Sequence, residues 1–488
     1  MRLALILVAL LTSGATPLRV GSKSFTEAVI LGELASQSLR ADGFPVEHRR
    51  QLGGTRVLWS ALLAGQLDVY AEYTGTLSQE IFGGKVKADV EALRTALQAQ
   101  HLGISTPLGF ENTYALGMLR ARAAALGLSK ISGLATHPEL ELSFSNEFLD
   151  RQDGWPALAR AYGLKEMKVR GLDHDLAYRA LESGAVAVTD LYSTDAEIRA
   201  YDLTVLEDDR RFFPDYRAVF IYRDDLPAEA IARLNALGGT LSQTVMVALN
   251  ASVKLEHQTE SQAAAAHLAR SGVHGASRER GLFGQLLKNT ADHLFLVGTS
   301  LVAAIAVAIP LGVFAARRRR LGVVVMGVTG ILQTVPSLAL LVFMIPLLGI
   351  GARPAIAALF LYSLLPIVRN THAGLTGIPG ELTESAEVLG LRPWTSLWRV
   401  ELPLASRSIL AGIKTAAVIN VGTATLGALI GAGGYGQPIL TGIRLNRIDL
   451  ILQGAIPSAV LALGVQGLFA ASERVLVSPG LRTTRESS

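Results

Sequence analysis

The sequence of 488 residues contains no cysteine. Disulfide bonds, thiolate metal sites, thiol nucleophiles and a lipid-modified N-terminal cysteine are therefore excluded. The G-x-x-x-x-G-K-[ST] loop that cradles the phosphates of ATP is also missing, so the chain cannot bind ATP in that manner. The formal net charge is only +4, and basic residues do not gather with aromatic ones, which argues against nucleic acid as a partner. No local motif groups metal ligands or places serine, histidine and aspartate together as in a hydrolase, so neither a metal nor a cofactor is expected.

Apolar residues make up 50% of the chain but are unevenly distributed. Residues 18 to about 280 carry charges throughout, as in a soluble α/β protein, whereas long runs with few charges dominate from about residue 291. A helix needs roughly 20 apolar residues to cross about 30 Å of hydrocarbon. Five runs near that length predict an all-α, five-helix transmembrane domain over 291–475, with spans at about 292–316, 322–349, 354–371, 406–431 and 449–472.

The second of these runs is ambiguous. It is longer than one crossing requires and contains Pro336 and Pro346. Two crossings there would reverse the side of the membrane assigned to every later segment. Tilt or a kink accommodates extra length at modest cost, so a single crossing is predicted.

Charges near the ends of the runs predict the direction of insertion. Four arginines, 317–320, follow the first run, and an excess of arginine marks the cytoplasmic side. Residues 1–15 have a positive start, an apolar stretch and small residues at the end, as in a signal peptide or a retained anchor. Both observations place residues 16–275 outside the cytoplasm, followed by a linker over 276–290 and, after the spans, a cytoplasmic tail over 476–488. We expect a multi-pass protein of the inner, cytoplasmic membrane.

One segment of the soluble part recurs 119 residues later, from Trp59 to Tyr178. The matched positions are Trp59, Ala61, Leu62, Gly65, Val69 and Tyr73 in the first copy, and Tyr178, Ala180, Leu181, Gly184, Val188 and Tyr192 in the second. Each copy predicts an amphipathic helix that ends at the glycine, then a strand that ends in tyrosine. Although such units can resemble each other by chance, the repeat favours two related lobes, 18–111 with 210–272, and 112–209. A ligand would bind between them, at the carboxyl ends of strands.

Two short patterns resemble known sites without the context that those sites need. Residues 431–436 fit G-x-G-x-x-G, yet they follow a membrane helix on the predicted outer side, and no βαβ unit surrounds them. A flexible turn is predicted there instead. Asp173, His174 and Asp175 are metal-ligand types, but no further histidine or cysteine stands at ligand spacing. They are predicted to form a solvated helix start.

A polar segment between the third and fourth runs carries a specific spacing. Glu384-Ser385-Ala386, then three residues and Gly390, then nine residues and Val400-Glu401-Leu402-Pro403, resembles the E-A-A…G…I-x-L-P loop of ABC importer permeases. Only Ser385 and Val400 depart from that pattern, both conservatively. The resemblance implies a short cytoplasmic helix that docks on a separate ATPase subunit, with coupling residues Glu384, Ala386, Gly390, Leu402 and Pro403. Gly390 would permit a sharp turn, and Pro403 would break the chain before the fourth span.

Motifs in the soluble part resemble the substrate-binding proteins of osmoprotectant ABC importers. They are Gly21-Ser22-Lys23-Ser24-Phe25-Thr26-Glu27, Leu52-Gly53-Gly54-Thr55, Glu72-Tyr73-Thr74-Gly75-Thr76, Asn112-Thr113-Tyr114-Ala115-Leu116 and Tyr192-Ser193-Thr194-Asp195-Ala196. The resemblance covers about 18–272, and a betaine-type permease matches about 282–475. It implies a hinged, two-lobed α/β periplasmic-binding-protein fold of type II in front of the permease. Since that family takes up glycine betaine, choline and carnitine, a small quaternary-ammonium ligand is expected.

The binding site of that family is a cage of tyrosines, which the resemblance places at Tyr73, Tyr114, Tyr192 and Tyr216. A quaternary ammonium has no N–H to donate, so aromatic faces attract its diffuse charge, each by roughly 0.5–2 kcal/mol. For a ligand carboxylate the resemblance implies Lys23, Thr76 and Arg151, and a guanidinium can make a two-pronged contact. Asn112 precedes a cage tyrosine and is expected either to touch the ligand or only to shape the hinge.

The ligand and the class of protein retain alternatives. Many relatives read F-T-E-Q where this chain has Phe25-Thr26-Glu27-Ala28, so another betaine such as ergothioneine remains open. An importer of amino acids would rely on Lys23 and Arg151, and its tyrosines would only pack. A receptor that senses solute without moving it would not need the Glu384–Pro403 spacing. The expected assembly has two copies of this chain and two ATPase subunits, and the chain itself is not expected to be an enzyme.

Overall fold

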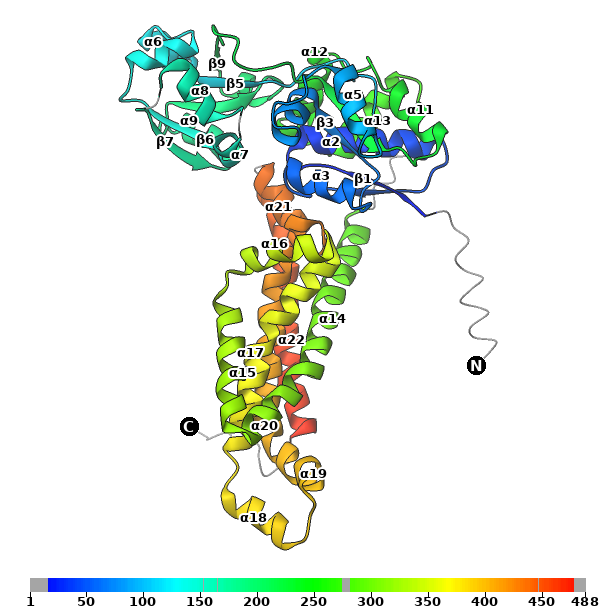
Figure 1. Ribbon diagram of the computed structural model, residues 1–488, viewed down its shortest axis with the longest axis vertical. Helices are drawn as coiled ribbons and strands as arrows, with labels where there is room; N and C mark the ends of the chain where they lie inside the picture. The colour runs from blue at the N-terminus through cyan, green and yellow to red at the C-terminus, as the bar shows by residue number, and fades with distance from the viewer. Residues whose placement is uncertain (1–15, 152, 165, 274–280, 446, 478–488) are drawn as a thin grey trace. The chain divides into compact units, whose positions relative to one another are not determined.

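The computed structural model describes residues 16–151, 153–164, 166–273, 281–445 and 447–477. The predicted signal segment 1–15 and nearly all of the predicted tail lie outside the described residues. The chain divides into two compact units, Met1–Glu279 and Arg280–Ser488. Figure 1 shows a mixed α/β architecture in the first unit and helices alone in the second.

The first unit contains two five-stranded sheets. One sheet has the order β2-β1-β3-β10-β4, in which β1 is parallel to β2 and β3, while β10 is antiparallel to β3 and β4. Its strands are β1 (Leu18–Gly21), β2 (Val46–Arg49), β3 (Val69–Tyr73), β4 (Leu102–Ile104) and β10 (Ala218–Arg223). The helices of this lobe are α2 (Thr26–Ala41), α3 (Thr55–Leu63), α4 (Thr74–Thr76), η1 (Leu77–Ile81), α5 (Val90–Gln98), α11 (Ala228–Ala236), α12 (Gln243–Lys254) and α13 (Glu260–Arg270). Nearly every residue of α2 is buried, because α11, α12 and α13 pack against it.

The second sheet has the order β7-β6-β8-β5-β9. Strands β6, β7 and β8 are parallel, and β5 is antiparallel to β8 and β9. Its strands are β5 (Tyr114–Leu119), β6 (Glu141–Ser145), β7 (Lys168–Leu172), β8 (Val188–Tyr192) and β9 (Leu203–Leu206). The helices of this lobe are α6 (Arg120–Leu126), η2 (Ile131–Thr136), α7 (Asn146–Asp150), α8 (Trp155–Tyr162), α9 (His174–Glu182) and α10 (Glu197–Ala200).

The two sheets share one plan, which confirms the predicted pair of related lobes. The repeated segment forms α3 and β3 in one lobe, and α9 and β8 in the other. Gly65 and Gly184 follow the two helices with φ of +63° and +76°, the left-handed conformation that glycine adopts at helix ends. Both β3 and β8 are the central strand of their sheet. Tyr73 and Tyr192 therefore stand at equivalent strand ends.

Two backbone segments connect the lobes and pair with each other. The N–H of Asn112 donates to the carbonyl of Tyr216 at 3.0 Å, and Glu111 forms an antiparallel bridge with Arg217. The N–H of Thr74 donates to the carbonyl of Arg217 at 3.0 Å, which ties the end of β3 to the same crossing. The two connecting segments run from β4 to β5 and from β9 to β10. Their pairing therefore brings together residues next to the ends of these four strands.

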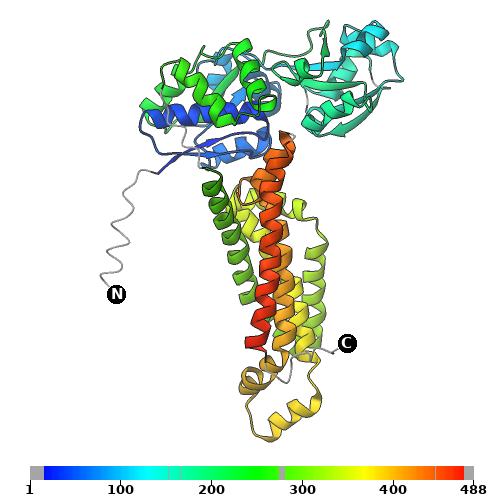
Figure 2. The same cartoon turned by 180° about the vertical axis from the view of Figure 1, so that it is seen from behind.

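The second unit is a bundle of helices. Its elements are α14 (Leu282–Arg317), α15 (Arg319–Thr334), α16 (Ser337–Leu348), α17 (Ala352–Thr376), α18 (Gly380–Val388), α19 (Pro393–Ser396), η3 (Leu397–Glu401), α20 (Leu402–Thr423), η4 (Ala424–Ile430), α21 (Gly436–Arg444) and α22 (Ile448–Leu476). In the described residues, four helical segments are long and apolar enough to cross a membrane, and a fifth crossing follows if α15 and α16 make one together. Helices α14, α17 and α20 pack on one another in the centre, and Figures 1 and 2 show α16 and α21 at one end of the bundle and α18 and α19 at the other.

The run over 322–349, predicted to cross once with a tilt or a kink, forms two helices separated by a sharp bend. Helices α15 and α16 meet at Pro336 with a bend of 99°. Proline disfavours the helical conformation of the residue before it and lacks an N–H, and Val335 is accordingly extended at ψ 126°. The hydroxyl of Tyr362 donates to the Val335 carbonyl that the break leaves open. Helix α15 alone spans about 24 Å at 1.5 Å per residue, so a kink and not a tilt accommodates the length of this run, and its single crossing stays a prediction.

Helix α14 begins earlier than the predicted first span. It starts at Leu282, inside the stretch predicted as a linker. Leu282, Phe283, Leu286 and Leu287 recur at helical spacing and are all exposed in this unit, so an apolar stripe continues the helix beyond the span. Residues 276–280 of the predicted linker lie outside the described residues.

A buried polar cluster lies in the middle of the bundle. The amide of Asn420 on α20 donates to the hydroxyls of Ser300 on α14 at 3.1 Å and Ser363 on α17 at 2.8 Å. All three side chains are fully buried. Because polar groups inside a membrane bundle need internal partners, this cluster ties the three central helices together.

The glycine-rich match at residues 431–436 forms a turn, as predicted, and no dinucleotide site. It connects η4 to α21 with φ of +75° at Gly431, +79° at Gly433 and +77° at Gly434. The elements before and after the turn are both helical, so the strand that precedes a phosphate-binding loop is missing from this described segment.

Gly184→Ala should lower the free energy of unfolding of the first unit by about 1–2 kcal/mol, the cost of a left-handed conformation for alanine. Open space surrounds the position, so steric contacts add nothing. Thermal melting followed by intrinsic fluorescence measures the loss, about 2–4 °C per kcal/mol for a domain of this size. Gly184→Asn, which tolerates this conformation better, is the matched control and should lose less. Equal melting temperatures for all three proteins would contradict the assignment.

Candidate functional site

Three of the four predicted cage tyrosines form one aromatic cluster. Tyr114 and Tyr192 are directly opposite partners in the β5–β8 pair; their ring centres lie 5.0 Å apart and their hydroxyl oxygens 3.3 Å apart. Tyr216 approaches Tyr114 edge-on at 6.0 Å. Phe148 adds a ring 5.0 Å from Tyr114. Sequence motifs did not indicate Phe148, which is fully buried behind the cluster.

Tyr73 joins this cluster through its neighbours. The ammonium of Lys23 lies 5.4 Å from the ring centre of Tyr73 and 5.9 Å from that of Phe25. Phe25 in turn stacks on Tyr192 at 5.7 Å. The four predicted tyrosines are therefore linked ring to ring or through Lys23, and all lie at strand ends or at the lobe crossing.

Lys23 is already paired with a carboxylate. It follows β1, and its ammonium contacts Glu72 of the neighbouring strand β3, with both side chains buried. Burying a charge is costly unless a partner compensates it. The structure therefore gives Lys23 an internal partner at the position where the resemblance implied a ligand carboxylate.

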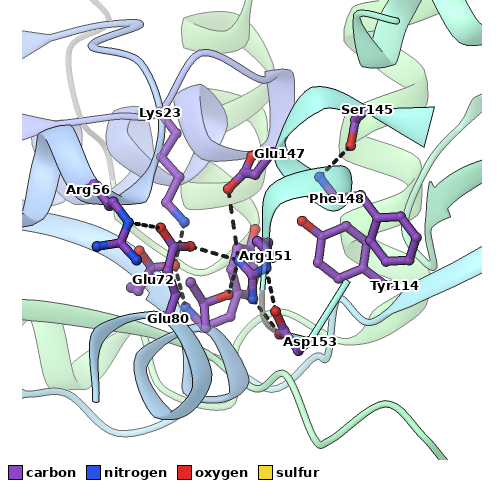
Figure 3. Close-up of polar contacts among 12 residues, drawn as sticks. Lys23, Arg56, Glu72, Glu80, Tyr114, Ser145, Glu147, Phe148, Arg151 and Asp153 are labelled. Carbon is purple, nitrogen blue, oxygen red and sulfur yellow. Dashed lines mark hydrogen bonds and ion pairs between the residues drawn. The ribbon is translucent and has the colours of Figure 1, made fainter. Parts of the chain in front are cut away.

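Arg151 is likewise held by acidic side chains (Figure 3). Its guanidinium makes a two-pronged contact with Asp153 at 2.7 and 2.5 Å and reaches Glu80 at 3.0 Å. Thr76 accepts a longer bond from the same group at 3.5 Å. The guanidinium carbon lies 5.3 Å from the ring centre of Tyr114, so a cation already rests against the aromatic cluster.

Glu27 belongs to the motif of residues 21–27 but is not among the predicted site residues. It lies in the first turn of α2 and is fully buried. Burial raises the pKa of its carboxyl group above the ordinary value, although hydrogen bonds from Thr194, Tyr73 and Asn250 act in the opposite direction. Asn112, predicted as a ligand or hinge residue, also donates to it, at 2.9 Å. Nothing local in the sequence signals these four partners, which come from distant segments.

A recess opens beside this carboxylate. It is small, and it is lined among others by Glu27, Asn112, Tyr192, His174 and Lys254. Two of the predicted site residues, Asn112 and Tyr192, thus line the same recess as Glu27.

The prediction of a solvated helix start at residues 173–175 is wrong for His174. Its side chain is only 15% exposed and contacts the carboxylate of Asp195 at 3.1 Å, with Asp190 at 3.7 Å. Its ring packs 4.6 Å from that of Tyr192. Burial alone would lower the pKa of His174, but the two carboxylates outweigh it and raise the pKa well above the ordinary value. His174 is thus a buried cation that packs against Tyr192 of the aromatic cluster.

A serine–histidine–acid arrangement does exist, although no local motif revealed it. His48 contacts the Ser22 hydroxyl at 3.0 Å and the Glu33 carboxylate at 2.7 Å. All three side chains are nearly fully buried. The three residues connect the end of β1, strand β2 and helix α2 through hydrogen bonds. Because they are buried, a substrate cannot reach them, and we interpret them as structural and not as a hydrolase site.

The predicted coupling loop forms helix, turn and helix. Ala386 on α18 is buried, Glu384 on the same helix is exposed, and Gly390 after it has φ of +73°, so the predicted sharp turn is present. Val388, Leu389 and Trp394 are 88%, 79% and 70% exposed. This surface is unusually apolar for the end of a helical bundle.

Pro403 does not break the chain, contrary to the prediction. Residues Pro393–Ile430 form one helical run in which η3 is a π-turn and Pro403 lies in the first turn of α20. Proline inside a helix lacks an N–H and clashes with the carbonyl four residues earlier, and the wider π-turn just before Pro403 accommodates it without breaking the run. Leu402 next to it is half-buried. Glu401, at the end of the π-turn, accepts two bonds at 2.8 Å from Arg317, the last residue of α14.

The raised pKa of His174 predicts a pH-dependent stability. The charged imidazole contributes fully below its unfolded pKa of about 6.5, and this contribution disappears as the pH rises through the higher folded pKa. His174→Gln should therefore cost about 1.5–3 kcal/mol near pH 6, and progressively less in alkaline solution. Melting temperatures across this range measure the effect, with the exposed His101→Gln as control. A loss that is equal at acid and alkaline pH would refute the assignment.

Comparison with known proteins extends over both units. Residues 16–270 match the family described as the substrate-binding domain of the ABC-type glycine betaine transport system. Residues 308–477 match the family described as the binding-protein-dependent transport system inner membrane component.

Curated relatives match the second unit. The glycine betaine/carnitine/choline transport system permease protein OpuCB of Bacillus subtilis (strain 168) is 43% identical over 205 residues, which cover 42% of this chain and 94% of that protein. The choline transport system permease protein OpuBB of the same organism is 42% identical over 205 residues, with the same shares covered. The carnitine transport permease protein OpuCB of Listeria monocytogenes is 45% identical over 201 residues, covering 41% of this chain and 92% of that protein.

Solved structures match the first unit. A crystal structure of a glycine betaine/carnitine/choline ABC transporter is 26% identical, with a TM-score of 0.46, and covers 53% of this chain and 99% of that chain. Apo YehZ from Escherichia coli is 27% identical, with a TM-score of 0.42 and the same shares covered. The family matches show that this chain belongs to the ABC-type glycine betaine import family, with a substrate-binding domain and a membrane permease domain fused in one polypeptide.

Proposed function

We propose that the chain captures a quaternary-ammonium solute of the glycine betaine, choline or carnitine type and passes it through its own permease domain. The observation that carries the ligand class is the cluster of Tyr114, Tyr192 and Tyr216 at the lobe crossing. A trimethylammonium group offers no N–H, so buried aromatic faces are the surfaces that attract it. The names of the permease relatives point to the same solutes.

Arg151 supports a cationic occupant. Its guanidinium lies over Tyr114 at a distance at which cation–π attraction operates. A trimethylammonium group would occupy the same kind of position against Tyr114, with Tyr73, Tyr192, Tyr216 and Asn112 around it.

A ligand carboxylate would have to replace Glu72 and Asp153 as the partner of Lys23 and Arg151. Lys23 and Arg151, with Thr76, are the groups proposed to receive it, yet Glu72 and Asp153 hold both cations in the described structure. Betaines, carnitine, ergothioneine and amino acids carry such a carboxylate, whereas choline does not. Choline therefore binds without this exchange.

The energy is proposed to come from an ATPase subunit at the coupling loop. Glu384 and Ala386 lie on α18, Gly390 follows the exposed Val388 and Leu389 directly, and Leu402 and Pro403 begin α20. The contact between Arg317 and Glu401 supports placing the arginines and this loop on one face of the membrane. With the arginines inside, the binding domain lies outside the cytoplasm, and two copies of the chain form the pathway with two ATPase subunits.

Isothermal titration of the full chain in detergent, against choline, glycine betaine, carnitine, ergothioneine and glycine, tests the ligand class. Tyr114→Leu should weaken choline binding by about twofold to thirtyfold, because one cation–π contact of roughly 0.5–2 kcal/mol is lost. Tyr201→Leu, which changes a tyrosine that stacks on Tyr178 instead, is the matched control and should bind as the parent does. Tight binding of glycine, or unchanged affinity of the Tyr114 variant, would contradict the cage.

Gly390→Val should abolish choline uptake by cells that carry the chain and its ATPase, since valine is strained at φ of +73°. Choline binding in detergent should stay unchanged, because the first unit is untouched. Gly380→Ala, at an unobstructed position at the start of α18, is the matched control and should transport normally. Normal uptake by the Gly390 variant would remove the coupling role of this turn.

A further inference from the structure

Glu27 receives four hydrogen bonds on its two carboxylate oxygens. Tyr73 donates its hydroxyl at 2.5 Å and Asn112 its amide at 2.9 Å to one oxygen. Thr194 donates its hydroxyl at 2.5 Å and Asn250 its amide at 2.9 Å to the other. An ionised carboxylate accepts at about four lone-pair positions, so this set of donors matches the charged form.

The four donors come from parts of the chain that must be arranged together to form the site. Tyr73 ends the central strand of one lobe, and Thr194 follows the central strand of the other. Asn112 belongs to the crossing segment, and Asn250 to α12. The side chain of Glu27 therefore holds the ring of Tyr73 in place and connects it to Thr194 of the opposite lobe.

Glu27 differs from the other buried acids in the charge of its partners. Glu72 contacts Lys23, and Asp153 contacts Arg151. Within the described residues, the four hydrogen-bond partners of Glu27 are all neutral. None of these four donors carries a positive charge, and the hydroxyl of Tyr73 that donates to Glu27 is polarised toward an electron-richer ring.

We propose that Glu27 is a positioning residue that makes the cage select cations over neutral molecules of the same shape. It orients Tyr73 and joins it to Asn112 and Thr194 across the lobes. Its carboxylate lies beside the recess that Asn112 and Tyr192 line, together with His174 and Lys254, which are paired with Asp195 and Glu197. This inference rests on the proposed function, since it concerns the same quaternary-ammonium site.

The test compares choline with 3,3-dimethylbutan-1-ol, its uncharged isostere, by isothermal titration of the full chain in detergent. The parent chain should prefer choline strongly. In Glu27→Gln the affinity for choline should fall at least tenfold, while the affinity for the isostere changes less than twofold. The ratio of the two affinities thus reports the charge of Glu27, and a purely structural defect would lower both affinities together.

Glu33→Gln is the matched control. Glu33 is a buried carboxylate on the same helix, but its partners are Gln37, His48 and Arg50, none of which touches the cage. This variant should lower the melting temperature and leave the ratio of affinities unchanged. Tyr73→Phe removes only the hydroxyl, and in the double variant with Glu27→Gln its effect should be smaller than alone, because both changes remove one interaction.

The outcomes separate this inference from the proposed function. If the parent chain binds neither choline nor a betaine, the proposed function falls and the inference falls with it. If the parent binds choline but Glu27→Gln keeps the parent's ratio, or loses both affinities in parallel, the inference alone is overturned. Should Glu27→Gln not fold, Tyr73→Phe decides, and an unchanged ratio in that variant overturns the inference as well.

Discussion

The pairing of the two segments that cross between the lobes is the constraint on which the first unit depends. Asn112 donates its backbone N–H to Tyr216, and the neighbouring residues form a bridge. Residues far apart in the sequence are therefore adjacent where the lobes join. The aromatic cluster sits at that junction because Tyr114 opens strand β5 directly opposite Tyr192. Rings in this place contact both lobes, so their packing and the mutual position of the lobes cannot be set independently.

Charge is distributed around this junction according to the cost of burial. An isolated buried ion is unfavourable, and a pair is tolerated when its geometry is good. Lys23 and Arg151, which the family resemblance implied as contacts for a ligand carboxylate, each have an acidic partner in the structure. The predicted chemistry and the observed pairing are compatible only if those acids yield to the ligand. Glu27 relies on neutral donors instead, and this distinguishes it from every other acid discussed.

The sequence allowed prediction of those features that depend on neighbouring residues alone. The helix–glycine–strand repeat was readable because a left-handed glycine ends a helix whatever lies around it, and Gly65 and Gly184 are both found in that conformation. The break at Pro336 also has a local cause, but its size depends on packing with α17 and could not be predicted. The partners of Glu27 and the burial of His174 were missed because they arise from contacts between segments that only the fold brings together.

The helical run that contains Pro403 has a structural consequence. Its π-turn continues into α20, and Glu401 within it is anchored to Arg317 at the end of α14. The described chain therefore has no irregular joint between this part of the loop and α20, and α20 is held to α14 near its first residues. The cluster of Asn420, Ser300 and Ser363 lies farther along the same helix. One continuous helical run therefore connects the predicted coupling loop to the buried polar contacts that hold α14, α17 and α20 together.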